Sequence, residues 1–310
     1  MQKLISIVTP CFNEEENVLE VYRQVKNVFN ELKDYRYEHI FIDNSSTDKT
    51  LQILKEIAQN DFNVKIIVNS RNFGIVNGYY AMLQSTGDAV IQLVADLQEP
   101  PYLIKDLLKK WEEGYKIVLA VKNKSEESKI MYAVRTFYYN TFNKLSDIQI
   151  INHFSGFGLC DRLIIDILRK IDDPSADLRG LLGEIGFEKA IINFTQPIRH
   201  RGVSKNNLYK LYDHAMLCIT GYSKIPLRIS TFIGFLIATL SLLVALGYFI
   251  YKLFFWNSFQ LGIAPLIIGI FFFGGVQLLF LGIIGEYIGA IFTQVKKHPL
   301  VIEKERINFD

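Results

Sequence analysis

Residues 4–42 read LISIVTPCFNEEENVLEVYRQVKNVFNELKDYRYEHIFI, and this stretch decides the fold class. A short run rich in β-branched residues, 4–8, comes first, and an amphipathic stretch over about 14–32 follows it. A second apolar run occupies residues 39–42. Strand, helix and strand in this order are typical of a parallel sheet with helices packed on its faces. The stretch therefore predicts an α/β fold.

The same rhythm continues along the chain. A helix is expected over about residues 48–59, and further strands are expected at 64–68, 89–93 and 117–121. We expect one doubly wound, Rossmann-like parallel sheet with helices on both faces. In such sheets ligands bind beyond the carboxyl ends of the strands. The residues that directly follow each apolar run are therefore the candidates for a functional site.

These strand ends are unusually polar. They read PCFNE at 10–14, DNSS at 43–46, NSRNFG at 69–74 and DLQE at 96–99. Asp43 could accept a hydrogen bond from a nucleotide base, and Asp96 offers a hard oxygen ligand for Mg²⁺ or Mn²⁺. Arg199 or Lys205 could contact a diphosphate. Taken singly these signals are weak, because an Asp after a strand is more often a helix cap or turn residue.

The C-terminal third contains two long uncharged stretches. Residues 229–251 carry no charge, Lys252 interrupts, and 253–285 is again uncharged until Glu286. Each stretch can cover a bilayer core, which takes roughly 20 helical residues. A buried helical hairpin is the alternative, but the rest of the chain is too small to bury two such helices. We expect two membrane helices, over about 229–251 and 263–285.

The charged residues indicate orientation and partners. Basic residues flank both stretches, namely Lys205, Lys210, Lys224, Arg228, Lys296, Lys297, Lys304 and Arg306. By the positive-inside rule both termini are expected in the cytoplasm, on a multi-pass protein of the cytoplasmic membrane. The net charge of +2 gives no basis for nucleic-acid binding. The three cysteines lack metal-ligand spacing and are expected to be reduced.

Several motifs carry a family resemblance: SIVTPCFNEEENV at 6–18, RNFG at 71–74, ADLQEPP at 95–101, RHRGVSK at 199–205 and GGVQLLFLGIIGEYIGAI at 274–291. The chain resembles the family 2 glycosyltransferases, and among them the polyprenyl-phosphate (undecaprenyl or dolichyl) enzymes with two C-terminal transmembrane helices. The resemblance spans nearly the whole chain. It implies a GT-A fold and transfer of a hexose or N-acetylhexosamine from a nucleotide donor, with a UDP-sugar expected, to undecaprenyl phosphate for cell-envelope glycan modification.

The resemblance also implies roles for individual residues. A nucleotide site would be formed by Pro10, Phe12, Asn13, Glu14, Asp43, Asn72 and Gly74. A divalent cation, Mg²⁺ or Mn²⁺, would be bound by Asp96 and Gln98, and the catalytic set would be Asp96, Arg199 and Lys205. The expected partners are a nucleotide sugar, a polyprenyl phosphate and the membrane, while a homo-oligomer is left open.

The expected organisation along the chain has five parts. Residues 1–125 form the nucleotide-sugar-binding half and 126–205 the acceptor side of the catalytic domain. Residues 206–228 form a juxtamembrane amphipathic segment, and 229–289 hold the transmembrane helices. A cytoplasmic tail covers 290–310. An amphipathic, aromatic-rich stretch at 131–145 suits either a bilayer-surface helix or an ordinary core helix.

Three departures from the family pattern stand out. Val94 replaces the first aspartate of the usual metal motif, and Asp43-Asn44-Ser45 replaces the usual Asp-Asp-Gly. SGFGLCDR at 155–162 lacks the Asp-Phe-Arg of many relatives, and Asp161 within it is expected to be a helix cap.

The departures keep an alternative open, a catalytically silent nucleotide-sugar-binding membrane protein that acts through a partner. A processive polysaccharide synthase is less favoured, because two spans make a poor channel and no Gln-x-x-Arg-Trp segment is present. Glu184 is expected to be a buried carboxylate that reads a sugar hydroxyl or pairs with a residue such as Arg179.

Overall fold

The computed structural model describes residues 2–124, 154–171, 177–196, 219–255, 263–296 and 298–309, with the single residues 151, 173 and 216. The chain divides into two compact units, which are taken separately. One comprises Met1–Asn143, Ile148–Leu208 and Lys297–Asp310, and the other comprises Lys144–Asp147 and Tyr209–Lys296. The stretch expected at 131–145 and the cysteine Cys218 lie outside the described residues.

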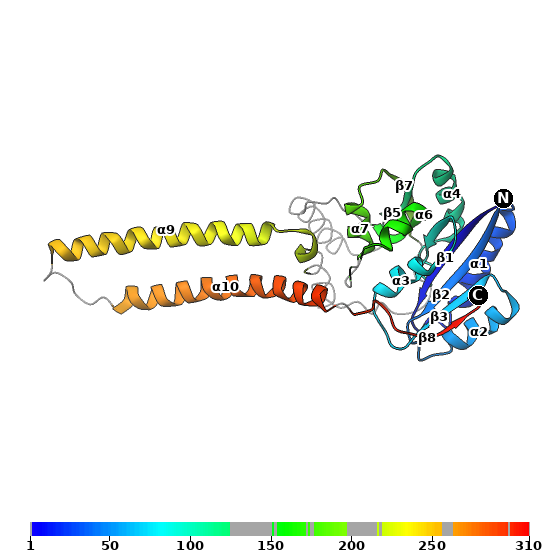
Figure 1. Cartoon of the computed structure of the whole chain (residues 1–310), viewed down its shortest axis with the longest axis horizontal. Coiled ribbons are helices and arrows are strands. Elements are labelled where there is room, and N and C mark those ends of the chain that lie inside the picture. Colours follow the sequence, from blue (N-terminus) through cyan, green and yellow to red (C-terminus); the bar gives the residue numbers. More distant parts are fainter. Residues whose placement is uncertain are drawn as a thin grey trace. The chain divides into compact units, whose positions relative to one another are not determined.

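The first unit contains one mixed sheet of eight strands in the order β7-β5-β6-β4-β1-β2-β3-β8 (Figure 1). Its strands are β1 (Lys3–Cys11), β2 (Tyr35–Asp43), β3 (Val64–Asn69), β4 (Ala89–Gln92), β5 (Ile117–Lys124), β6 (Phe154–Asp161), β7 (Lys189–Thr195) and β8 (Glu303–Ile307). Its helices are α1 (Val18–Glu31), α2 (Thr50–Asn60), α3 (Val76–Gln84), η1 (Pro101–Leu103), α4 (Ile104–Glu112), α6 (Arg162–Leu168) and α7 (Leu178–Glu184).

The centre of the sheet is parallel, as the sequence predicts. β1 pairs in parallel with both β2 and β4, and β2 pairs in parallel with β3. The prediction of a wholly parallel sheet is wrong at β6, which runs antiparallel to β4 and β5, and at β8, which runs antiparallel to β3. Glycines conceal β6 in the sequence: a Cβ at Gly158 would lie 2.6 Å from the carbonyl oxygen of Val118, so the strand needs glycine where an alternating apolar residue would have revealed it.

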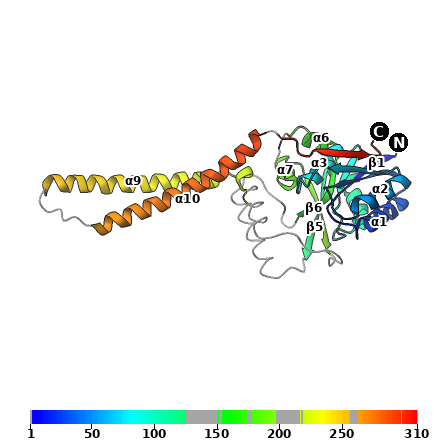
Figure 2. The same cartoon turned by 90° about the horizontal axis from the view of Figure 1, so that it is seen from below.

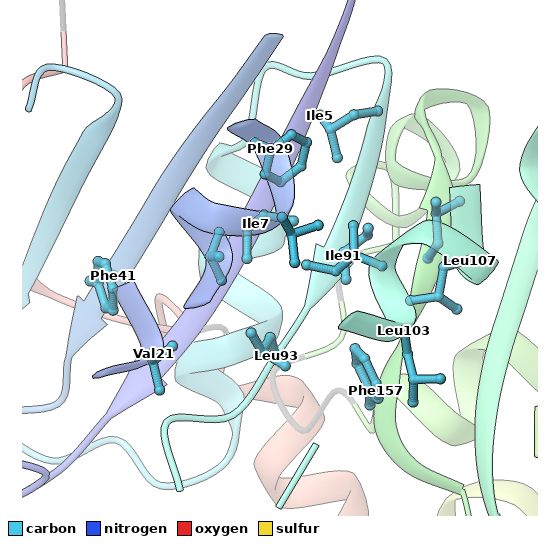
Figure 3. Packing of buried hydrophobic residues seen from close by; sticks show 14 of the residues in the cluster. Ile5, Ile7, Val21, Phe29, Phe41, Ile91, Leu93, Leu103, Leu107 and Phe157 are labelled. Carbon is cyan, nitrogen blue, oxygen red and sulfur yellow. The ribbon is translucent and has the colours of Figure 1, made fainter. Parts of the chain in front are cut away.

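Helices cover both faces of the sheet, as expected. One face presents Ile5, Ile7, Phe41 and Ile91 to α1, α2 and α4, and Figure 3 shows these side chains packed together. The other face presents Val8, Ile40, Ile42 and Ile67 to α3, α6 and α7. Residues of alternate parity along a strand point to opposite faces, so nearly every residue of the central strands is buried. Full burial of one such side chain stabilises the fold by roughly 1.5–3 kcal/mol.

The C-terminal residues add an edge strand to the sheet. Tyr80 Oη donates to Glu303 Oε1 (2.8 Å), and Lys55 Nζ lies 2.7 Å from Glu305 Oε2. Asn308 Nδ2 donates to the carbonyl oxygens of Ala58 (2.9 Å) and Val64 (2.8 Å). The sequence EKERI of this strand is short and charged, which suits an edge that must not pair with other chains. Residues 303–307, expected in a cytoplasmic tail, are thus part of the eight-stranded sheet.

The second unit consists mainly of α9 (Ile225–Phe254) and α10 (Ile263–Val295), which run side by side in opposite directions in both views (Figure 1, Figure 2). A Cβ at Gly234 would lie 3.6 Å from Phe280, and Tyr287 Oη donates to the carbonyl oxygen of Ser223 (2.6 Å). Their outer faces expose large apolar side chains such as Phe235 and Leu278.

One stretch of the described helices, Phe272–Val295, is long and apolar enough to cross a membrane, with a mean hydropathy of 1.7. The apolar part of α9 that meets the same composition, Ile225–Ser241, is shorter. The sequence predicts two membrane spans, and only one described stretch meets the criteria of length and composition. The two-span hairpin therefore stays a prediction.

Burial of His39 makes the stability of the first unit depend on pH. Its ring is fully buried, its Nε2 lies 2.9 Å from Thr9 Oγ1, and burial lowers its pKa to about 3. The unfolded chain binds a proton near pH 6.5 and the folded chain only near pH 3, so folding stability falls as the pH drops between these values. We expect a loss approaching about 1.4 kcal/mol per pH unit below 6.

The measurement is denaturant unfolding of the full chain in detergent at pH 7 and pH 5, followed by tryptophan fluorescence. His39→Gln should remove the His39 contribution and so flatten the dependence. Equal pH dependence in the wild type and in His39→Gln would contradict the assignment.

Candidate functional site

A cavity of about 500 Å³ lies at the carboxyl ends of the central strands. Five of the residues predicted for the site line it, namely Pro10, Phe12, Glu14, Gly74 and Asp96. The others along its wall are Cys11, Asn44, Ile75, Asn77, Tyr79, Gln92, Val94, Ala95, Gly156, Asp177, Leu178 and Arg179. The location agrees with the rule that ligands of α/β sheets bind beyond the strand ends.

Asn13 connects the loop after β1 to the loop after β2 through hydrogen bonds. Its backbone is left-handed (φ +56°), and its Oδ1 accepts from the backbone N–H of Thr47 (2.8 Å). Its own N–H donates to Ser46 Oγ (3.0 Å), and the N–H of Glu14 donates to Thr50 Oγ1 (2.8 Å). Asn13 does not line the cavity, so its observed contribution is to hold its neighbours Phe12 and Glu14 there.

Asp43 is buried at the end of β2. Its Oδ2 accepts from the backbone N–H of Ser46 (3.1 Å), whereas its Oδ1 has no partner among the described residues. Desolvation by burial raises the pKa of this carboxyl. Asp43 is not part of the cavity wall, but the next residue, Asn44, is. An unsatisfied buried acceptor calls for a ligand donor or an ordered water, since leaving it unpaired is costly.

Asn44 organises the loop after β3. Its Nδ2 donates to Asn72 Oδ1 (3.0 Å) and to the carbonyl oxygen of Gly74 (3.2 Å). Its Oδ1 accepts from Asn69 Nδ2 (3.0 Å) and from the backbone N–H of Phe73 (2.9 Å). Asn72, predicted in the nucleotide site, is exposed and outside the cavity wall; its Oδ1 also accepts from the N–H of Gly74 (2.8 Å). One buried amide thus shapes the loop that carries Gly74 into the cavity.

Ser45 occupies a strained backbone position. Its φ is +63°, in the left-handed region where a Cβ is unfavourable by roughly 1–2 kcal/mol and glycine is tolerated. We expect Ser45→Gly to raise the free energy of unfolding by about 0.5–1 kcal/mol, because glycine removes the strain but loses more chain entropy. Thermal unfolding of the full chain tests this, with Ser45→Ala as control. An equal gain from alanine, which keeps the Cβ, would show that backbone strain is not the cause.

A tight turn holds Asp96 in the cavity. Leu97 has a left-handed backbone (φ +59°), and the N–H of Gln98 donates to Asp96 Oδ1 (3.1 Å). The buried Glu99 accepts from the N–H of Val94 through Oε2 (3.1 Å), which closes the loop. Val94 lines the cavity beside Asp96, whereas Gln98 does not line it. The structure therefore places Asp96 on the cavity wall and gives Gln98 only a backbone contact with it, so the metal-binding roles of both stay predictions.

The cavity wall also contains residues that the sequence did not predict for the site. Asp177 and Arg179, at the start of α7, form an ion pair (Oδ1 to Nε, 3.3 Å) and line the cavity. Gln92 on β4 and Asn77 at the start of α3 line it as well. Gln92 could have been predicted from the sequence, because it is a polar residue inside the apolar run 89–93. The sequence around α7 has no such feature that would indicate Asp177 and Arg179.

Comparison with known proteins places the chain. Residues 6–165 match the family described as glycosyl transferase family 2. The chain belongs to this family. It is 35% identical over 303 residues to the SfII prophage-derived bactoprenol glucosyl transferase of Shigella flexneri, covering 97% of each chain. It is 33% identical over 302 residues to the prophage bactoprenol glucosyl transferase homolog of Escherichia coli K12, covering 97% of this chain and 98% of that one.

In this family 2 glycosyltransferase, which has a mixed α/β sheet, the motif around Asp96 implies a divalent metal. The described residues hold no cluster of three metal-ligating side chains. Mg²⁺, however, commonly uses one or two carboxylates together with substrate phosphates rather than an all-protein cage. Asp96, a carboxylate on the cavity wall, fits that role. The site thus fits a cation that arrives with a nucleotide diphosphate.

Other expectations derived from the family motifs have mixed outcomes. Arg199 and Lys205 lie outside the described residues. Asp161 caps α6, as predicted, by accepting from the N–H of Leu163 (2.9 Å). Glu184 was expected to be buried, but it is exposed near the end of α7. The apolar letters around it indicated burial, whereas the last turn of this short helix faces solvent.

Proposed function

We propose that this protein transfers a hexose or N-acetylhexosamine from a nucleotide donor, most simply a UDP-sugar, to undecaprenyl phosphate at the cytoplasmic face of the membrane. The observation that carries the proposal is the cavity at the strand ends, with Asp96 on its wall and the nucleotide-side residues Pro10, Phe12 and Gly74 around it. The full-length similarity to bactoprenol glucosyl transferases favours glucose as the sugar. The product would serve cell-envelope glycan modification.

The chemistry needs no general base on the protein. A lipid phosphate is already an anion at neutral pH, so its oxygen attacks the anomeric carbon as the bond to the nucleoside diphosphate breaks and inverts that carbon. The diphosphate leaves with the bonding electrons. The chain's task is to position both substrates and to exclude water. The carboxyl of Asp43 would accept from the base, and Arg199 with Lys205 would face the phosphates.

A divalent cation, when bound with the nucleotide, supplies charge neutralisation for the leaving diphosphate. Asp96 would hold it; the family motif also assigns Gln98 to the cation, although Gln98 is not on the cavity wall. α9 and α10 would form the transmembrane hairpin predicted at 229–251 and 263–285, with both termini in the cytoplasm. Their exposed apolar faces support this, since monomeric soluble proteins rarely expose apolar surface of this extent.

The test is transfer by the purified full chain in detergent with undecaprenyl phosphate and a panel of nucleotide sugars, with lipid-linked product measured after extraction. We expect product with at least one donor, with UDP-glucose as the first choice. No lipid-linked sugar from any donor would overturn the proposal.

The alternative function is that of a sensor, a catalytically silent protein that binds a nucleotide sugar and acts through a partner. It rests on Val94, which lines the cavity where the family usually has an aspartate. Calorimetry on the same preparation distinguishes the two functions. Binding of a nucleotide sugar without turnover would favour the sensor.

A further inference from the structure

Gln92 is a polar residue at a core-facing position of the central sheet. It ends β4, where Ile91 is fully buried on one face and Val90 packs on the other; Leu93, the next residue, is buried with Ile91. Gln92 shares the face of Val90 and Val94 by strand alternation. Val90 there contacts apolar side chains, but Gln92 and Val94 line the cavity. A polar side chain at such a position needs a reason, because an apolar residue would pack at lower cost.

Gly78 makes room for the Gln92 amide. A Cβ at Gly78 of α3 would lie 3.1 Å from Gln92 Nε2, a tight contact, whereas a Cβ at Gly156 of β6 would lie 3.6 Å from it, an ordinary van der Waals distance. Gly156 also has a φ of +110°, which other residues rarely adopt. The amide therefore occupies a space between α3 and β6 that a larger residue at 78 would narrow.

The Gln92 amide makes no hydrogen bond with any residue in the described part of the chain, although it can donate twice and accept twice. Nearby side chains of the site are satisfied locally, as in the ion pair of Asp177 with Arg179. An amide that packs against Gly78, has no hydrogen-bond partner among the described residues and lines the cavity is suited to a polar ligand that enters the cavity.

The order of the strands indicates which part of the ligand Gln92 meets. The nucleotide-side residues follow β1, β2 and β3, whereas β4 lies on the other side of β1, next to β6. A donor whose base lies over the β2 and β3 ends therefore extends toward β4 with its diphosphate and sugar. Asp96, just after β4, is the residue assigned to the diphosphate, and Gln92 lies deeper along the same strand.

We propose that the side-chain amide of Gln92 hydrogen-bonds a hydroxyl of the transferred sugar and so contributes to donor selectivity. The inference rests on the proposed function, because it requires a sugar in this cavity. In this proposal Gln92 does not contact the bond that breaks. It binds a hydroxyl of the sugar and takes no part in the chemical step. A site that hydrogen-bonds a hydroxyl discriminates against an analogue that lacks it, because the protein group is left unpaired.

The experiment compares wild-type full chain with Gln92→Met, which keeps the side-chain length and removes the amide. Calorimetry measures the Kd of UDP and of UDP-glucose, and transfer assays measure kcat/KM with UDP-glucose and its 2-, 3- and 4-deoxy analogues. We expect UDP affinity within twofold of wild type and a loss of about 3- to 30-fold for UDP-glucose, the range of one or two hydrogen bonds. One of the deoxy donors lacks the hydroxyl that Gln92 binds. With that donor we expect the wild type and Gln92→Met to have the same kcat/KM.

Gly78→Ala is the second variant. Its Cβ would press on the Gln92 amide at 3.1 Å, while alanine otherwise favours the helix, so donor selectivity should change without loss of stability. Two outcomes would overturn the Gln92 assignment alone. In the first, Gln92→Met lowers kcat/KM by the same factor with every deoxy donor as with UDP-glucose. In the second, Gln92→Met weakens the binding of UDP as much as that of UDP-glucose. Absence of transfer by the wild type with any donor would overturn the proposed function, and this inference with it.

Discussion

Asp96→Asn is expected to lower kcat by at least about 100- to 1,000-fold while the fold remains intact. A carboxylate facing a divalent cation and a departing diphosphate cannot be replaced by a neutral amide of the same shape. The turn itself should survive, because the backbone N–H of Gln98 donates to Oδ1 (3.1 Å), and an asparagine oxygen accepts the same bond. The loss should therefore appear in turnover and not in the unfolding midpoint.

The measurement is single-donor transfer with Mn²⁺ or Mg²⁺ titrated from an EDTA-treated preparation. Asp106→Asn on α4, an exposed carboxylate outside the cavity, is the matched control and should behave as wild type. Near wild-type turnover by Asp96→Asn in EDTA would show that Val94 marks a metal-independent site. Gln98→Ala separates the two metal ligands implied by the motif, since the structure gives Gln98 only a backbone contact.

The sequence was sufficient for the parts of the fold and site that depend on local pattern. Apolar runs such as 39–42 located the central strands, and the polar residues that follow them do converge, because parallel strands share one carboxyl edge. Phe12 and Asp96 could be placed in the cavity for this reason.

The rest depends on long-range contacts that leave little local signal. The strand β6 is hidden by glycines that fit against β5, and β8 pairs with β3 although most of the chain separates them in sequence. The surroundings of Gln92 come from different elements, because its amide packs against Gly78 of α3 and lies near Gly156 of β6. From the sequence, Asn44 was only a departure from the family motif. Its hydrogen-bond partners Asn69 and Asn72 lie at the end of the next strand and in the loop after it, so the sequence around Asn44 does not show them.

Asn44→Asp, which brings back the usual family residue, is expected to destabilise the chain by about 2–4 kcal/mol. The Nδ2 of Asn44 donates to Asn72 Oδ1 and to the carbonyl oxygen of Gly74, and a carboxylate would face both acceptors without a proton. The site is only 4% exposed, and the adjacent Asp43 is itself a buried carboxyl whose pKa is raised. Asp43 forms no ion pair with any described cation, so a second buried negative charge beside it adds to the electrostatic cost.

Denaturant unfolding of the full chain measures this, together with UDP affinity, which should fall because Gly74 loses its support. Asn44→Ala is the control that deletes the hydrogen bonds without adding charge, so it should be less harmful than Asn44→Asp at pH 7. Lowering the pH toward 5 should reduce the difference, because the introduced carboxyl regains one donor when it is protonated. If Asn44→Asp is as stable as wild type, the loop can adopt the arrangement of its Asp-Asp-Gly relatives. The expected destabilisation would instead show that Asn44, Asn69 and Asn72 form a substitute for that motif, and the departure would then be no sign of a silent protein.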